Sequence, residues 1–157
     1  MPSICAIFTH YGSRQRSLTC LRRLAQQTRR PDAIVIINNS TADDPITAEA
    51  PALAAELLPA NTLHLLQMPT NLGNAGGCAH GMNYAFGRLH ADYVWVLDDD
   101  SWPRPHSLEN LLAVQVPPQT VRMSLVIDPA KDDELSWPLT MCTGNERTPW
   151  KNAICTQ

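Results

Sequence analysis

Short apolar runs alternate with helical stretches along most of the chain. The runs are rich in β-branched and aromatic residues, which predicts strands at residues 4–8, 33–37, 62–67, 93–97 and 120–127. Between them, apolar residues recur at helical spacing, which predicts helices over 13–28, 46–58 with an interruption or a start near Pro51, from Ala75 to about Leu89, and 106–114. This alternation is typical of an α/β fold, an open and mostly parallel sheet with helices on both faces.

The predicted helix after Ala75 carries two stripes. One is apolar and contains Cys78, Met82, Phe86 and Leu89; the other is small and contains Gly77, Gly81 and Ala85. A glycine inside a helix costs about 1 kcal/mol relative to alanine. A close approach of another backbone is a reason to keep one there.

The pattern weakens after Asp128. Residues 128–157 contain turn-forming residues and isolated apolar ones, so we expect one strand near residues 135–141 and a poorly specified tail. We therefore expect a division into residues 1–127 and residues 128–157.

Composition excludes several classes. The 157 residues are 44% hydrophobic and 17% charged, which suits one domain with a core. A net charge of -3 without a basic stripe argues against nucleic acid as a partner. Five cysteines without a C-x-x-C pattern indicate a reduced, cytoplasmic chain. No apolar run predicts a transmembrane segment, and peripheral association with the inner face of a membrane stays open.

Each of the first four predicted strands is followed directly by a polar segment. These segments begin at Thr9, Asn38, Met68 and Asp98. In an open α/β sheet, ligands bind outside the carboxyl ends of the strands. We therefore expect the four segments to line one crevice.

The glycine-rich segment 71–81, NLGNAGGCAHG, precedes a predicted helix. Backbone N–H groups at such a helix start can hold a phosphate or diphosphate. A tight turn followed by the close-packed small stripe would produce the same composition, and the spacing is not that of a dinucleotide-binding fold.

Asp98, Asp99 and Asp100 follow the fourth strand. In an extended segment, Asp98 and Asp100 share a side and can converge on one Mg²⁺ or Mn²⁺ ion, which would offset their repulsion. The alternative is that Asp100 or Ser101 caps the next helix while the other aspartates are solvated.

Three motifs together carry a family resemblance: TRRPDAIVIINNSTADD at 28–44, NLGNAGGCAHGM at 71–82 and YVWVLDDDSWPRP at 93–105. Their order and spacing resemble the family 2 glycosyltransferases with a GT-A (Rossmann-like) fold, in particular the galactofuranosyl- and rhamnosyltransferase branch. The resemblance implies metal-dependent, inverting transfer from a UDP- or dTDP-linked nucleotide sugar to a glycan or lipid-linked acceptor, with Mn²⁺ or Mg²⁺ as cofactor. It covers roughly residues 3–127.

The resemblance also implies roles for residues. It makes Asp98 and Asp100 the metal ligands and puts Asp99 near the ribose. The implied nucleotide-sugar contacts are Thr9 and Arg14 after the first strand, Asn38 at the base, and Asn71, Gly73, Gly76 and Gly77 in the glycine segment. Asn38 replaces the usual aspartate, so it would read a base with a neutral amide oxygen. Whether Arg14 or Arg16 contacts the nucleotide stays open.

Enzymes of this family use a general base downstream of the aspartates. The candidates considered after the next predicted helix are Asp132, Asp133, Glu134 and Glu146, and each reads better as a solvated loop charge. We therefore expect the donor-binding part of a glycosyltransferase without an evident catalytic base. The alternative is a non-catalytic nucleotide-sugar-binding module that acts with a partner chain. An aspartyl phosphotransferase is disfavoured, because the first strand ends without an aspartate.

Overall fold

The computed structural model describes residues 1–117, 120–124, 126–128, 130–135, 140–143 and 146–149. The chain forms two compact units, Met1–Pro117 and Pro118–Gln157. The first unit therefore ends before residue 127, the boundary expected from the sequence. The assignment of donor binding to the first part stays a prediction.

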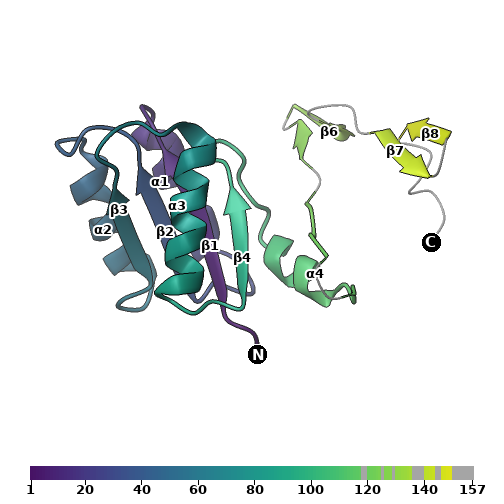
Figure 1. The fold of residues 1–157 in the computed structure, drawn as a ribbon, viewed down its shortest axis with the longest axis horizontal. Coiled ribbons are helices and arrows are strands. Elements are labelled where there is room, and N and C mark those ends of the chain that lie inside the picture. Colours follow the sequence, from purple (N-terminus) through teal and green to yellow (C-terminus); the bar gives the residue numbers. More distant parts are fainter. Residues whose placement is uncertain (118–119, 125, 129, 136–139, 144–145, 150–157) are drawn as a thin grey trace. The chain divides into compact units, whose positions relative to one another are not determined.

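Four parallel strands form the sheet of the first unit (Figure 1). They are β1 (Ile4–His10), β2 (Ala33–Asn38), β3 (Leu63–Gln67) and β4 (Tyr93–Leu97), in the order β3-β2-β1-β4. All four correspond to predicted strands, although β1 continues to His10. Because every strand is parallel, all four carboxyl ends lie at the same edge of the sheet.

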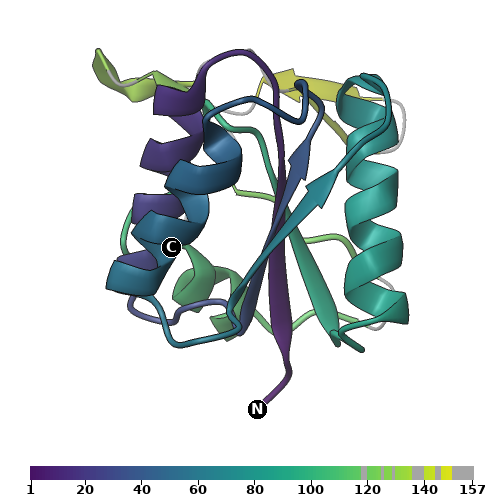
Figure 2. The ribbon, with the colours of Figure 1, turned by 90° about the vertical axis from the view of Figure 1, so that its left-hand side faces the viewer.

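Helices cover both faces of the sheet, as predicted. They are α1 (Arg14–Ala25), α2 (Ile46–Leu57), α3 (Gly73–Gly87) and α4 (Ser107–Ala113). Figure 2 shows α1 and α2 on one side of the sheet and α3 on the other. The observed α/β architecture confirms the predicted fold class.

The alternation of side chains along β1 builds two core layers. Ala6 and Phe8 pack in one layer with Leu21 of α1, whereas Cys5 and Ile7 pack in the other, on the α3 side. A strand buried on both faces needs apolar residues at every position. This explains why β1 and β2, which are buried along nearly their whole length, appear in the sequence as continuous apolar runs.

Helix α2 is continuous through Pro51, so the predicted interruption is wrong. Pro51 is the sixth residue of α2, so its missing N–H removes one intrahelical bond, the one to the Thr47 carbonyl. Ile46, Ala50 and Ala54 are buried against the core, and this packing holds the helix together across the proline.

The small stripe of α3 is the face that packs on the sheet. Gly77, Gly81 and Ala85 are buried, whereas Met82 and Phe86 of the apolar stripe are 36% and 50% exposed. A Cβ at Gly81 would lie 2.7 Å from Ile37 Cδ1. The close approach expected from the glycines is therefore present.

The second unit contains two antiparallel pairs. β5 (Ile127–Asp128) pairs with β6 (Lys131–Leu135), and β7 (Thr140–Thr143) pairs with β8 (Glu146–Pro149). Of the strand expected near residues 135–141, Leu135 belongs to β6 and residues 140–141 belong to β7. Residues 136–139 lie outside the described part.

The strand predicted over residues 120–127 is wrong. Of its described residues, only Ile127 belongs to a strand. Val121 and Met123 are 84% and 73% exposed, so these two apolar side chains do not belong to a core. Apolar β-branched composition alone does not form a strand without a partner.

None of the helices in the described ranges combines the length and the hydrophobicity needed to cross a bilayer.

Candidate functional site

The carboxyl edge of the sheet contains the polar segments predicted to form one crevice. The chain runs from β1 outward to β2 and β3, then returns to place β4 on the other side of β1. The direction of winding therefore changes between β1 and β4. In open α/β sheets, ligands bind at the carboxyl ends next to such a switch point.

Asn74, in the first turn of α3, connects the two strands at the switch point. Thr9 Oγ1 of β1 donates a hydrogen bond to Asn74 Oδ1 at 2.8 Å, and Asn74 Nδ2 donates to Asp98 Oδ1 at 2.9 Å. Cys78 Sγ lies 3.4 Å from the same Asn74 oxygen. The start of α3 and the aspartates are therefore joined by a side chain that the sequence analysis did not single out.

The three aspartates form a turn rather than the extended segment expected from the sequence. Ser101 N donates to the Asp98 carbonyl at 3.2 Å, which closes the turn. The three side chains consequently meet different partners. Asp98 bonds to Asn74, Asp99 accepts from Ser17, and Asp100 lies 3.6 Å from Arg16.

The helix-cap alternative for Asp100 and Ser101 is wrong. The next helix, α4, begins at Ser107 with His106 at the N-cap position. The aspartate turn is separated from that helix by residues 102–105. Local helix capping therefore does not account for the three carboxylates.

Asp99 is the least exposed of the three aspartates. Burial raises the pKa of Asp99, and the hydrogen bond from Ser17 offsets only part of this increase. Asp98 and Asp100 are exposed. Two accessible carboxylates therefore flank one that is held against the protein.

A buried polar chain runs from Asp99 into the first unit. Ser17 Oγ of α1 donates to Asp99 Oδ2 at 3.2 Å and lies 2.7 Å from His10 Nδ1. His10 Nε2 lies 3.4 Å from Asp44 Oδ2, just before α2. His10 and Ser17 are both fully buried. This chain connects the segments that follow β2 and β4.

The glycine segment divides into two parts with different geometry. Asn71 Oδ1 accepts from Gly73 N at 2.8 Å, and Gly73 has a positive φ of 67°, which favours glycine. A Cβ at Gly76 would lie 2.7 Å from Leu72 Cβ. At Gly77 it would collide with Thr9 Cγ2. The preceding residues Asn71 and Leu72 thus determine the first turn of α3, whereas Gly77 is required for the packing of α3 on β1.

The helix start leaves N–H groups available for an anion. The first four N–H groups of an α-helix have no acceptor within the helix. Here two of them are already bonded: Leu72 N donates to Asn39 Oδ1 at 3.5 Å and Gly73 N donates to Asn71 Oδ1 at 2.8 Å. The N–H groups of Asn74 and Ala75 remain at the end of α3 that Asn74 joins to Asp98.

Asn38 is fully buried within a local network. Its Oδ1 accepts from Ser40 N at 2.9 Å, and its Nδ2 donates to Gln67 Oε1 at 2.7 Å. The neighbouring Asn39 donates to the Gly73 carbonyl at 3.0 Å. Asn39 therefore fastens the glycine segment to β2, while base reading by Asn38 stays a prediction.

The two arginines near the crevice have different partners. Arg14 lies 3.3 Å from Glu49 of α2, whereas Arg16 lies 3.6 Å from Asp100. Both pairs are solvent-exposed, so each contributes little stability. Arg16, rather than Arg14, is the cation beside the aspartate turn.

The crevice residues fit a cation that is shared with a ligand. Within the described ranges, no group of three or more His, Cys, Asp or Glu side chains is arranged to hold a metal. Mg²⁺ and Mn²⁺ commonly take one or two carboxylates and complete their coordination with water and phosphate oxygens. Asp98 and Asp100, both exposed, supply that kind of donor set.

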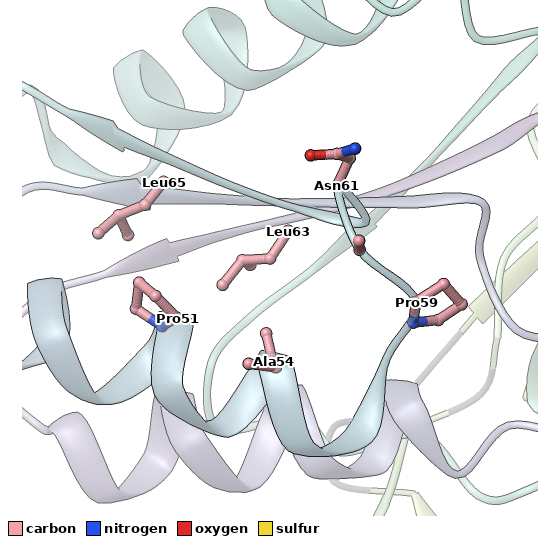
Figure 3. Close-up of a pocket in the computed structure, with 8 residues that line it drawn as sticks. Pro51, Ala54, Pro59, Asn61, Leu63 and Leu65 are labelled. Atoms are coloured by element: carbon pink, nitrogen blue, oxygen red, sulfur yellow. The ribbon is translucent and has the colours of Figure 1, made fainter.

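Two other hollows lie away from this edge. One, of about 200 Å³, separates Pro51 and Ala54 of α2 from Leu63 and Leu65 of β3 (Figure 3). Its lining has no charged side chain, which does not suit a phosphate. The second, of about 280 Å³, lies at the amino ends of the strands and includes Asp32. Neither contains the residues of the crevice.

The residues missed from the sequence are Asn74, His10, Ser17 and Asp44. Asn74 lies inside a motif that was read for its glycines, and a lone histidine carries little information. Strand order could have suggested them, because β1 and β4 are neighbours. Their hydrogen bonds, however, depend on side-chain directions that spacing does not define.

Comparison with known proteins identifies relatives over most of the chain. The sequence model of Glycosyl transferase family 2 matches residues 5–154. Galactofuranosyltransferase GlfT1 of Mycolicibacterium smegmatis is 33% identical over 100 residues, which are 64% of this chain and 30% of the relative. GlfT1 of Mycobacterium tuberculosis is 40% identical over 77 residues, 49% of this chain and 23% of the relative. The chain thus spans less than a third of these curated relatives.

Solved structures share the fold. Mannosyltransferase PcManGT from Pyrobaculum calidifontis, in complex with GDP-Man and Mn²⁺, has a TM-score of 0.62 at 23% identity; the match covers 82% of this chain and 36% of that one. Residues 1–349 of S. aureus TarS, in complex with UDP, give a TM-score of 0.53 at 22% identity over 71% of this chain and 31% of that one. With the match of the family sequence model, the chain belongs to Glycosyl transferase family 2, and its α/β sheet has the GT-A fold.

Proposed function

We propose that the crevice at the carboxyl ends of β1–β4 binds a nucleotide sugar together with a divalent cation. The hydrogen bond of 2.9 Å between Asn74 and Asp98 is the observation that carries this proposal. It joins the N–H groups at the start of α3, which suit a phosphate, to carboxylates that suit a cation. Diphosphate and metal would therefore meet at one point.

In this proposal, Asp98 and Asp100 hold the cation. Mn²⁺ or Mg²⁺ would offset the charge of the diphosphate and stabilise it as a leaving group. Asp99, held by Ser17 at 3.2 Å, would lie at the ribose. The N–H groups of Asn74 and Ala75 would face the phosphates, with Asn71 keeping Gly73 in place and Gly76 in the same turn of the helix.

The base would lie over the loops that follow β1 and β2. Thr9, Asn38 and Arg14 are the residues expected there from the family resemblance. Tyr11 is 65% exposed, and Gly12 N donates to Ser40 Oγ at 3.2 Å, so these loops touch. An exposed aromatic ring offers a stacking surface for a base.

The transferase activity of the whole protein is part of the same proposal. We infer metal-dependent transfer of the sugar, with inversion, to a hydroxyl of a glycan or lipid-linked acceptor. The relatives named galactofuranosyltransferase support UDP-linked galactofuranose as the first donor to test. Release of UDP that depends on an added acceptor would measure transfer.

The binding step is tested by calorimetric titration of UDP with and without Mn²⁺. Wild-type protein should bind UDP at least tenfold more tightly with Mn²⁺, a gain of about 1.4 kcal/mol. Asp98→Asn and Asp100→Asn should each remove this gain, because the neutral amide is a poor ligand for a hard cation. Glu56→Gln, which removes an exposed carboxylate on α2, should retain it. An affinity that Mn²⁺ leaves unchanged would contradict the proposal.

A further inference from the structure

His10 is a buried group to which the proposed function gives no role. It ends β1 and has no solvent exposure. Its two ring nitrogens meet different elements, Ser17 of α1 at 2.7 Å and Asp44 before α2 at 3.4 Å. The imidazole therefore lies between the loop that follows β2 and the helix that contacts the aspartate turn.

The direction of the hydrogen bonds follows from counting protons. The Ser17 hydroxyl has one hydrogen and can donate once. An ionised Asp99 can only accept, so the Ser17 hydrogen must point toward Asp99 Oδ2, 3.2 Å away. The 2.7 Å contact between Ser17 Oγ and His10 Nδ1 is then a hydrogen bond only if Nδ1 carries a proton and donates it.

We propose that His10 is a positioning residue for Asp99. Its Nδ1–H holds the Ser17 oxygen so that the Ser17 hydrogen points at the Asp99 carboxylate. Asp44 Oδ2, 3.4 Å from Nε2, can only accept, so Nε2 must carry the second ring proton and the ring is held at both edges as the imidazolium. A buried network in which every group has a partner is rigid. No buried side-chain N or O atom of the described residues lacks one.

The consequence of this positioning rests on the proposed function. Asp99 lies between Asp98 and Asp100 in one turn, so fixing its carboxylate limits how that turn can rotate. Preorganised ligands bind more tightly than mobile ones. His10 should therefore strengthen the part of UDP affinity that depends on Mn²⁺, although as a buried residue it would contact neither UDP nor the metal.

The hydrogen-bond direction can be measured without nucleotide. In protein labelled with ¹⁵N in its histidines, NMR at neutral pH should show a proton on Nδ1 of His10, and the signal of that proton should move in Ser17→Ala. If Nδ1 carries no proton, the Ser17 hydroxyl donates to the His10 ring and not to Asp99, and the proposal is overturned.

Three substitutions of His10 separate the contribution of its Nδ1–H to UDP binding from the contributions of Nε2 and of ring packing. Asparagine keeps an N–H near the position of Nδ1, glutamine keeps one near Nε2, and phenylalanine keeps neither. The gain in UDP affinity with Mn²⁺ should fall about tenfold in His10→Phe and His10→Gln, the size expected for a hydrogen bond in a charged network. His10→Asn should recover most of it. Equal losses in all three variants would indicate a merely structural role and overturn the proposal.

Ser17→Ala tests the same hydrogen-bond chain with little change in side-chain volume, because it removes the hydroxyl between His10 and Asp99. It should lower the Mn²⁺-dependent gain as much as His10→Phe, and the double variant should lose no more than either one. Thr62→Val is the matched control. It removes a buried hydroxyl that donates to the Pro59 carbonyl at 2.8 Å, next to the amino end of β3. Its Mn²⁺-dependent gain should stay at the wild-type value, and a tenfold loss there would overturn the proposal.

Failure of the proposed function is distinguishable from failure of this inference. If wild-type protein binds no UDP with Mn²⁺, the nucleotide proposal is wrong and the binding role of His10 falls with it. The NMR measurement would still decide whether His10 positions Asp99 through Ser17. If wild-type protein binds UDP with Mn²⁺ and His10→Phe does so equally, only the inference about His10 is wrong.

Discussion

The Asp44 carboxylate links the start of α2 to the buried His10. Its Oδ1 accepts from Ile46 N at 2.9 Å at the start of α2, and its Oδ2 lies 3.4 Å from His10 Nε2. Burial by itself would raise the pKa of Asp44, but the Ile46 N–H and His10 together hold it below its ordinary value of 3.8. The ionised form is thus favoured by folding.

This shift predicts how stability depends on pH. A carboxyl whose pKa is lowered by folding contributes stability above its ordinary pKa, and the contribution is lost as pH falls through the folded pKa. Wild-type protein should therefore be more stable than Asp44→Asn at neutral pH, and the difference should shrink below pH 3.8. Urea unfolding over a pH series measures this difference, with Glu56→Gln as control. A difference that stays constant with pH would contradict it.

Individual residues were predictable from the sequence only where their chemistry was unusual. Three adjacent aspartates after an apolar strand indicated a site by themselves. Asn74 did not, because its role arises only when α3 starts beside the end of β4, where it bonds to Asp98. A single histidine such as His10 carries little information in a sequence, and its partners come from α1 and from the turn before α2.

At the scale of elements, burial determined which predictions were correct. Strands β1 and β2 are buried on both faces, so their apolar runs gave a clear signal. Helix α3 begins at Gly73 rather than near Ala75, because Asn71 and the positive φ of Gly73 set the turn. The run over residues 120–127 had the same composition as a strand, but of its described residues only Ile127 belongs to one.

The glycines of α3 should differ in their sensitivity to alanine. A Cβ at Gly77 would collide with the short Thr9 side chain, and at Gly81 it would meet the mobile end of Ile37 at 2.7 Å. At Gly87, no atom outside the local helix lies within 4 Å. We expect Gly77→Ala to lose about 1–3 kcal/mol of unfolding free energy, Gly81→Ala less, and Gly87→Ala nothing or a small gain.

Urea unfolding of the three glycine variants tests this order. Gly87→Ala serves as the matched control, because it changes the same helix at its open end. Equal losses at all three positions would show that the loss comes from the helix backbone and not from packing against β1 and β2.

At the scale of the molecule, the alternating pattern was enough to predict a parallel sheet with polar segments at its carboxyl edge. The strand order was not predicted, although it places the switch point between β1 and β4. The division at residue 127 stays a prediction, while the first compact unit of the structure is Met1–Pro117. A cytoplasmic location and peripheral membrane contact stay predictions.

The central claim is that a diphosphate and a divalent cation meet beside the aspartate turn. Paramagnetic broadening by Mn²⁺ in the presence of UDP, read from backbone amide signals, tests it most directly. Broadening should be strongest at Asn74 and at residues 98–101 and should weaken toward Asn61 and Asp92, at the amino ends of β3 and β4. Broadening that does not depend on UDP, or that is strongest at the amino ends, would contradict the account.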